Sequence, residues 1–260
     1  MLSNESSYEY AWDFAPLTGR AIAPKDAEPS KMVILLHGYQ GDAHSNMNFA
    51  RTLARSMPEA LVVVPNGLSE VPGGGSPHVR QWWNLPSFEG RFYGAMPYLA
   101  PEEVRPGLEQ IVREAHVCAG ILNKFIRRRL LERGLSLRDA FLVGISQGGI
   151  TAFEMALFRS ELHKDAGGAS LGALVVIGAG IPGAERLRGE TNASIPPIPI
   201  LLARGRDDEI FPPSVDLFSD SLLRENGLPV RRAEVPSGHF GLEHAAAENV
   251  CRFLNEMKAR

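Results

Sequence analysis

Ser146 carries a hydroxyl whose sequence context is typical of a nucleophile. It stands in Gly144-Ile145-Ser146-Gln147-Gly148, which matches the pattern G-x-S-x-G. An apolar run at 140–143 precedes this pattern and a helix-like segment at 150–157 follows it, so we expect a strand, a sharp turn and a helix. Small glycines let the strand and the helix approach closely, and the serine hydroxyl then points outward. The alternative is an ordinary Gly-Ser turn, which the flanking segments disfavour.

A serine hydroxyl needs a base that removes its proton and a carboxylate that holds this base in the right tautomer. His239 is placed to act as the base, because it follows the strand-like segment 230–235. Three carboxylates at 207–209 follow the strand-like segment 198–203, and we expect one of them to orient the imidazole. The alternative is that these acidic residues belong to an ordinary turn at a helix N-terminus.

Strand-like and helix-like segments alternate along the chain. We expect buried strands at 32–36, 60–64, 140–145, 173–177 and 198–203, a strand nearer the edge at 230–235, and helices at 101–133, 150–159, 214–226 and 242–257. This alternation predicts an α/β fold with a mainly parallel central sheet and helices on both faces. We expect one domain over 1–260, with an N-terminal extension or edge strand at 1–30 and a long loop at 66–100 over the site.

The composition of the chain excludes several functional classes. A net charge of −3 with 22% charged residues provides no basic field for nucleic acid, and two cysteines exclude a disulfide framework. The N-terminus has no basic start or apolar core, and no apolar run approaches about 18 residues, so we expect a cytoplasmic protein without a transmembrane segment. No motif with metal-ligand spacing and no phosphate-binding loop occurs, so we expect no metal and no cofactor. Nothing in the sequence indicates an oligomeric state.

Four segments in order resemble the signature segments of the phospholipase/carboxylesterase group of α/β-hydrolases, which includes the acyl-protein thioesterases. These segments are 33–42, 144–149, 205–212 and 237–239. The similarity runs through about residues 33–254, and Arg80-Gln81-Trp82-Trp83-Asn84-Leu85 also resembles a stretch of that group. The resemblance implies an α/β-hydrolase fold and a cofactor-independent serine hydrolase that cleaves carboxylic esters, with thioesters as a second substrate class.

The resemblance also implies a role for each matching residue. Ser146 is then the nucleophile, His239 the general base and Asp208 the acid that orients the base, because the residues from Asp208 onward match the group's Asp-x-Val-Val-Pro pattern. The backbone N–H groups of Gln147 and Tyr39 are implied to form the oxyanion hole, which stabilises the charge of the transition state.

The chain departs from the group at two positions. Gln40 stands where the second glycine of the His-Gly-x-Gly pattern is usual. Arg204-Gly205 stands where the group has His-Gly before the acid, although this change replaces no member of the implied triad. The first departure concerns the backbone of the oxyanion loop, so it bears on the second N–H donor.

The long loop at 66–100 is rich in aromatic side chains. Trp82, Trp83, Phe92 and Tyr93 could wall an acyl pocket for a small-molecule or lipid-like acyl ester, since ligand sites are typically apolar clefts with few polar groups. The alternative is that these side chains pack into a small core of the loop itself.

Two other functions compete with the serine hydrolase. One is an enzyme of the dienelactone-hydrolase type, whose nucleophile is usually cysteine, and the serine at position 146 weighs against it. The other is a binding protein that keeps the hydrolase fold without turnover, because a fold does not determine a function. Such proteins commonly lose a triad member, whereas all three positions are filled in this chain.

Overall fold

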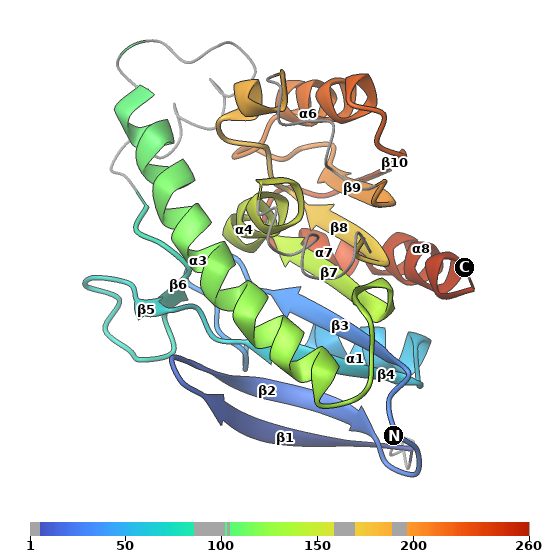
Figure 1. Ribbon diagram of the computed structural model, residues 1–260. Coiled ribbons are helices and arrows are strands. Elements are labelled where there is room, and N and C mark those ends of the chain that lie inside the picture. The colour runs from blue at the N-terminus through green and yellow to red at the C-terminus, as the bar shows by residue number, and fades with distance from the viewer. Residues whose placement is uncertain (1–5, 86–101, 103–104, 159–169, 189–196, 260) are drawn as a thin grey trace.

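The apolar run at 32–36 forms β3 (Lys31–Leu36), a central strand that lies between β4 (Ala60–Pro65) and β7 (Ala140–Ile145) (Figure 1). The computed structural model describes residues 6–85, 102, 105–158, 170–188 and 197–259. All six residues of β4 and all six of β7 are buried, as expected for strands that are covered on both faces. Continuous apolar runs therefore form the middle of the sheet.

Within the described residues, eight strands form one sheet in the order β1-β2-β4-β3-β7-β8-β9-β10. The other strands are β1 (Ser7–Phe14), β2 (Leu17–Pro24), β8 (Ala173–Ile177), β9 (Ile200–Gly205) and β10 (Val230–Val235). β1 pairs antiparallel with β2, β2 pairs antiparallel with β4, and the pairings from β4 to β10 are parallel. The predicted mainly parallel sheet is confirmed, and the N-terminal segment adds a hairpin of two strands rather than one edge strand.

Helices cover both faces of the sheet (Figure 1). They are α1 (Met47–Ser56), α3 (Arg105–Leu131), α4 (Gln147–Phe153), α6 (Pro213–Glu225), α7 (Leu242–Ala245) and α8 (Ala247–Lys258). One apolar cluster joins α3, α4 and α6 to one face, and a second cluster joins α1, α7 and α8 to the other. The predicted coverage of both faces is confirmed.

Shorter elements complete the described chain. They are the two-residue strands β5 (Ser69–Glu70) and β6 (Arg80–Gln81), the 3-10 turns Leu137–Asp139 and Ala184–Arg188, and the π-helical turn Glu154–Phe158, which continues α4. β5 and β6 pair with each other as a separate small sheet within the long loop. The described part of the loop between β4 and α3 therefore has secondary structure of its own.

The last predicted helix, 242–257, is interrupted at Ala246 and forms α7 and α8. The sequence pattern does not reveal the break, because Leu242 before it and Val250 after it pack into the same apolar cluster. Periodicity follows the buried face and not the backbone hydrogen bonds.

None of the helices in the described part of the chain is long and apolar enough to cross a membrane.

Candidate active site

Ser146 occupies a sharp turn between β7 and α4. Its backbone has φ 50° and ψ −116°, and its N–H donates to the carbonyl oxygen of Ile177 at 2.9 Å. A Cβ atom at Gly144 would collide with the carbonyl oxygen of Gly148, and one at Gly148 would collide with that of Leu36. The two glycines are therefore required for the close approach of strand and helix, and the turn holds the serine in a strained conformation.

His239 connects Ser146 to Asp208 by hydrogen bonds. Its Nε2 lies 2.9 Å from the Ser146 Oγ, and its Nδ1 lies 2.9 Å and 3.1 Å from the two carboxylate oxygens of Asp208. Because a carboxylate only accepts hydrogen bonds, the Nδ1–H donates to Asp208 and the Nε2 accepts from the serine hydroxyl. The three residues that the sequence singled out lie in one hydrogen-bonded line, although they are 62 and 31 residues apart along the chain.

Backbone groups hold the Asp208 carboxylate in place. Its Oδ1 accepts the N–H groups of Ile210 at 2.9 Å and Phe211 at 2.8 Å, and the carboxyl side chain is fully buried. Asp207 is exposed, and its backbone N–H donates to the Ser237 carbonyl oxygen. Of the three candidate carboxylates, the structure brings Asp208 to the imidazole nitrogen. Glu209 instead accepts the backbone N–H of His239 at 3.2 Å.

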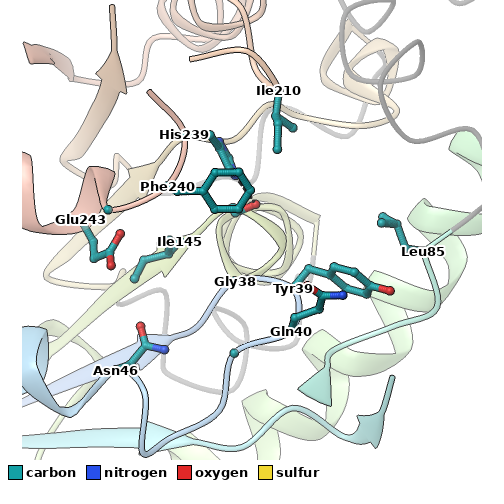
Figure 2. Close-up of a pocket in the computed structure, with 13 residues that line it drawn as sticks. Gly38, Tyr39, Gln40, Asn46, Leu85, Ile145, Ile210, His239, Phe240 and Glu243 are labelled. Carbon is teal, nitrogen blue, oxygen red and sulfur yellow. Dashed lines mark hydrogen bonds between the residues drawn. The ribbon is translucent and has the colours of Figure 1, made fainter. Parts of the chain in front are cut away.

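The loop after β3 forms the opposite side of the site. Gln40 has φ 65°, the left-handed conformation that favours glycine, which explains why a glycine is usual at this position. Its N–H donates to the carbonyl oxygen of Arg80 at 2.9 Å, and the Gly41 N–H donates to that of Gly38 at 3.0 Å. The turn therefore forms with glutamine, and Tyr39 lies within it at the edge of the cleft (Figure 2).

The neutral imidazole of His37 is hydrogen-bonded to this loop and to Gly67. The Gly67 N–H donates to its Nε2 at 2.8 Å, and its Nδ1–H donates to the Gly38 carbonyl oxygen at 2.8 Å. Complete burial disfavours the charged form and lowers the pKa of His37 to about 4. Motif matching places His37 in the oxyanion loop, but nothing in the sequence indicates that its ring ties two loops together.

Trp82 and Trp83 lie in the core beneath the site. The Trp82 indole N–H donates to the His37 carbonyl oxygen at 2.8 Å, and the Trp83 indole N–H donates to the Thr151 hydroxyl at 3.1 Å. Their exposed fractions are 2% and 3%, and neither residue lines the cleft. The sequence-based assignment of both to a substrate pocket is corrected, because their indole N–H groups find partners in the interior. Leu85, just after them, does line the cleft. The predictions for Phe92 and Tyr93 lie outside the described residues.

Arg204, the second departure from the resembled group, belongs to an ion-pair cluster with other residues. Its guanidinium lies 3.5 Å from Asp216 on α6 and also pairs with Glu234 on β10. Burial raises the pKa of Asp216 above its ordinary value, although Arg204 and Arg232 oppose this shift. The arginine therefore ties α6 to β9 and β10.

A cleft of about 550 Å³ opens above Ser146 and His239. Figure 2 shows Asn46 and Glu243 on one side of it and Tyr39 and Leu85 on the other. Ile145 and Ile210 add apolar surface, and the exposed ring of Phe240 stands beside His239. The cleft therefore has room for a small molecule next to the serine hydroxyl, with a polar and an apolar side.

The sheet order, the helices on both faces and the strand–turn–helix at Ser146 define an α/β-hydrolase fold. No protein-family model matches the chain. Among solved structures, esterase PE8 is 23% identical with a TM-score of 0.74, and the match covers 93% of this chain and 99% of that chain.

Two further solved structures share the fold. A carboxylesterase from Mesorhizobium loti is 18% identical with a TM-score of 0.65, covering 96% of this chain and 99% of that one. A phospholipase/carboxylesterase from Dyadobacter fermentans is 15% identical with a TM-score of 0.54, covering 88% and 94%. At these identities the likeness establishes the fold. One of these neighbours carries the phospholipase/carboxylesterase name of the group that the sequence resembles, and the other two are named an esterase and a carboxylesterase.

Proposed function

We propose that this protein is a serine hydrolase that cleaves carboxylic esters through an acyl-enzyme at Ser146. The observation that carries the proposal is the hydrogen-bonded line from the Ser146 Oγ through the His239 imidazole to the buried Asp208 carboxylate. The cleft above this line and the fold shared with esterases and carboxylesterases support it. Water is the second substrate, and no cofactor takes part in the proposed steps.

Acylation begins when the Ser146 Oγ attacks the ester carbonyl carbon. The His239 Nε2, at 2.9 Å, takes the hydroxyl proton as the new C–O bond forms. The imidazolium that results is stabilised by Asp208, which already accepts the Nδ1–H. When the tetrahedral intermediate collapses, the bond to the leaving alcohol breaks and His239 returns the proton to its oxygen.

The negative charge of the tetrahedral intermediate needs hydrogen-bond donors. We assign this role to the backbone N–H groups of Gln147, at the start of α4, and Tyr39, in the loop after β3. The N-terminus of α4 adds a favourable dipole beside the same oxygen. The turn at Gln40 supports the assignment, since it keeps the loop in the form that the usual glycine would allow.

Deacylation repeats these steps with water as the nucleophile. His239 takes a proton from water, the hydroxide oxygen attacks the acyl carbon, and the Ser146 Oγ leaves with the proton that His239 returns. The carboxylic acid is released and the free enzyme is restored. A thioester would follow the same sequence with a thiol as the leaving group, so paired oxygen and sulfur esters of one acyl chain should establish which class turns over faster.

Replacing the nucleophile tests the proposal. Ser146→Ala should reduce the hydrolysis of p-nitrophenyl acetate by at least about 10³-fold, because the covalent route is lost. Thermal unfolding should show that the variant still folds. Hydrolysis near the wild-type rate in a folded Ser146→Ala protein would refute the proposal.

A fluorophosphonate probe separates an enzyme from a binding protein with the same fold. The probe reacts with a serine only when a neighbouring base activates it. We expect covalent labelling of the wild type and none of Ser146→Ala or His239→Ala. A wild-type protein that stays unlabelled would point to a binder without turnover.

A further inference from the structure

Among the described residues, the polar side of the cleft carries a single negative group. Among the described residues that line the cleft, Glu243 alone has a carboxylate, and its side chain is 20% exposed. Figure 2 shows Glu243 and Asn46 on the same side of the cleft, across from Leu85 and Tyr39. The catalytic line uses neither Glu243 nor Asn46, so their place in the cleft calls for a separate explanation.

The ion pair that Glu243 forms is weak, so the negative charge of its carboxylate acts on groups in the cleft. Its neighbour His244 has its Nε2 3.4 Å from the Glu243 carboxylate, but 55% of that histidine side chain is exposed to solvent. Glu243 also lies in the first turn of α7, where an acidic side chain favours the helix dipole, although α7 has only four residues. A weak pair of this kind contributes little, so a cationic ligand in the cleft can compete with it.

Phe240 presents an aromatic ring at the same site. Its exposed fraction is 81%, which is unusual for a large apolar side chain, and it lines the cleft between His239 and Glu243 in the sequence. The ring packs edge-on against His239, with 5.6 Å between the ring centroids. An exposed aromatic ring and a carboxylate that line the same cleft are a combination that binds alkylated ammonium groups, through cation–π attraction and charge.

Asn46 adds a hydrogen-bond acceptor to this side of the cleft. Its amide nitrogen donates to the Asp42 carbonyl oxygen at 3.1 Å and to the Ser45 hydroxyl at 3.2 Å. With the nitrogen so engaged, the amide oxygen is the atom that can accept a hydrogen bond from a ligand. An acceptor and a carboxylate favour a cation and disfavour an anion at this position.

We propose that Glu243, Phe240 and Asn46 form a cation subsite, so that the enzyme prefers esters that carry an ammonium group over neutral esters of the same shape. This inference rests on the proposed ester hydrolysis and specifies its substrate class. The apolar side, with Leu85 and Ile210, then holds the uncharged part of the ester.

The test compares acetylcholine with its neutral carbon isostere, in which a tert-butyl group replaces the trimethylammonium group. For the wild type we expect kcat/KM to favour the cationic ester by roughly five-fold, since one partly exposed carboxylate and one aromatic ring act on it. Glu243→Gln should remove most of this preference by raising KM for the cationic ester alone, and should leave the smaller contribution of the Phe240 ring. Added salt should lower the wild-type ratio, because it screens the charge.

Two further variants show whether the effect is local. Glu248→Gln removes the same charge from a 90% exposed side chain on α8, outside the cleft, and should leave the wild-type ratio unchanged. Phe240→Leu should lower the ratio part of the way, since it keeps apolar surface but removes the aromatic ring. A wild-type ratio near unity, or one that Glu243→Gln leaves unchanged, would overturn the proposal.

A binding measurement separates this proposal from the proposed catalysis. In Ser146→Ala, calorimetry with the same two esters should give a lower Kd for the cationic ester, and the added Glu243→Gln change should remove most of the difference. Equal Kd values would overturn the cation subsite. If the wild type hydrolyses neither ester but the difference in Kd is still found, the cation subsite stands and the proposed function is rejected.

Discussion

The side-chain oxygen of Gln147 accepts the backbone N–H of Trp82 at 2.9 Å, which ties the residue after the nucleophile to a buried segment 65 positions earlier. The amide nitrogen of the same side chain donates to the Trp83 carbonyl oxygen at 2.8 Å. One buried side-chain amide thus satisfies the backbone N–H of Trp82 and the backbone C=O of Trp83, which lie outside the main sheet. The residue that we propose as an oxyanion donor through its backbone also holds the buried segment beneath the site through its side chain.

Removing this side chain should destabilise the protein. Gln147→Ala leaves a buried N–H and a buried C=O without partners, and we expect the free energy of unfolding to fall by about 2–4 kcal/mol. Urea denaturation measures the change. Gln110→Ala, which removes an amide bonded to Glu114 one turn away on α3, should cost no more than about 0.5 kcal/mol. Equal losses in the two variants would contradict the assigned role.

The two adjacent aspartates should differ sharply in their effect on turnover. Asp208→Asn removes the negative charge that fixes the His239 tautomer, so kcat should fall by about 10⁴-fold. Asp207 is exposed, and Asp207→Asn should stay within about two-fold of wild type, as surface changes usually do. Steady-state kinetics on one ester compares them. A larger loss of kcat in Asp207→Asn than in Asp208→Asn would show that Asp207, and not Asp208, orients the imidazole.

The conformation of Gln40 predicts how the protein's stability ranks with glutamine, valine or glycine at this position. At φ 65° a β-branched residue is strained, whereas glycine is not. Gln40→Val should lower the free energy of unfolding by at least about 1 kcal/mol, and Gln40→Gly should equal or exceed the wild type. Thermal unfolding ranks them. A valine variant more stable than the glycine variant would show that the loop does not hold this conformation in solution.

His37 should make stability depend on pH. Burial lowers its folded pKa to about 4 from an ordinary value of 6.5, so the neutral form is favoured by folding. This contribution is fully present above about pH 6.5 and is lost as the pH falls toward 4, a total of about 3 kcal/mol. Free energies of unfolding at pH 7 and pH 4 should therefore differ less in His37→Gln than in wild type. Parallel pH profiles would contradict the assigned neutral imidazole.

The parallel strands that the sequence predicts are found in the structure, and the three residues proposed for catalysis lie in one hydrogen-bonded line, for a physical reason. Buried strands need uninterrupted apolar residues, so runs such as 140–145 and 173–177 coincide with β7 and β8 as found. Ser146, Asp208 and His239 each follow a strand, and the carboxyl ends of parallel strands meet at one edge of the sheet. Local patterns therefore carry the information about these positions.

The packing of the long loop could not be predicted in the same way. Trp82 and Trp83 are bonded to groups 45 and 68 residues away, and no periodicity encodes such pairs. Aromatic composition is typical of both a pocket wall and a core, so it could not decide between them. The side-chain role of Gln147 was hidden for the same reason, since the motif explains only its backbone N–H.

Mass spectrometry of a rapidly acid-quenched reaction detects an acyl-enzyme at Ser146. Wild-type protein mixed with p-nitrophenyl acetate should gain one acetyl group, and peptide mapping should place it on Ser146. His239→Ala should show no acetylated Ser146 under the same conditions. If the wild type releases acetate while Ser146 stays unmodified, even at early times and with deacylation slowed, the reaction does not pass through an acyl-enzyme at Ser146.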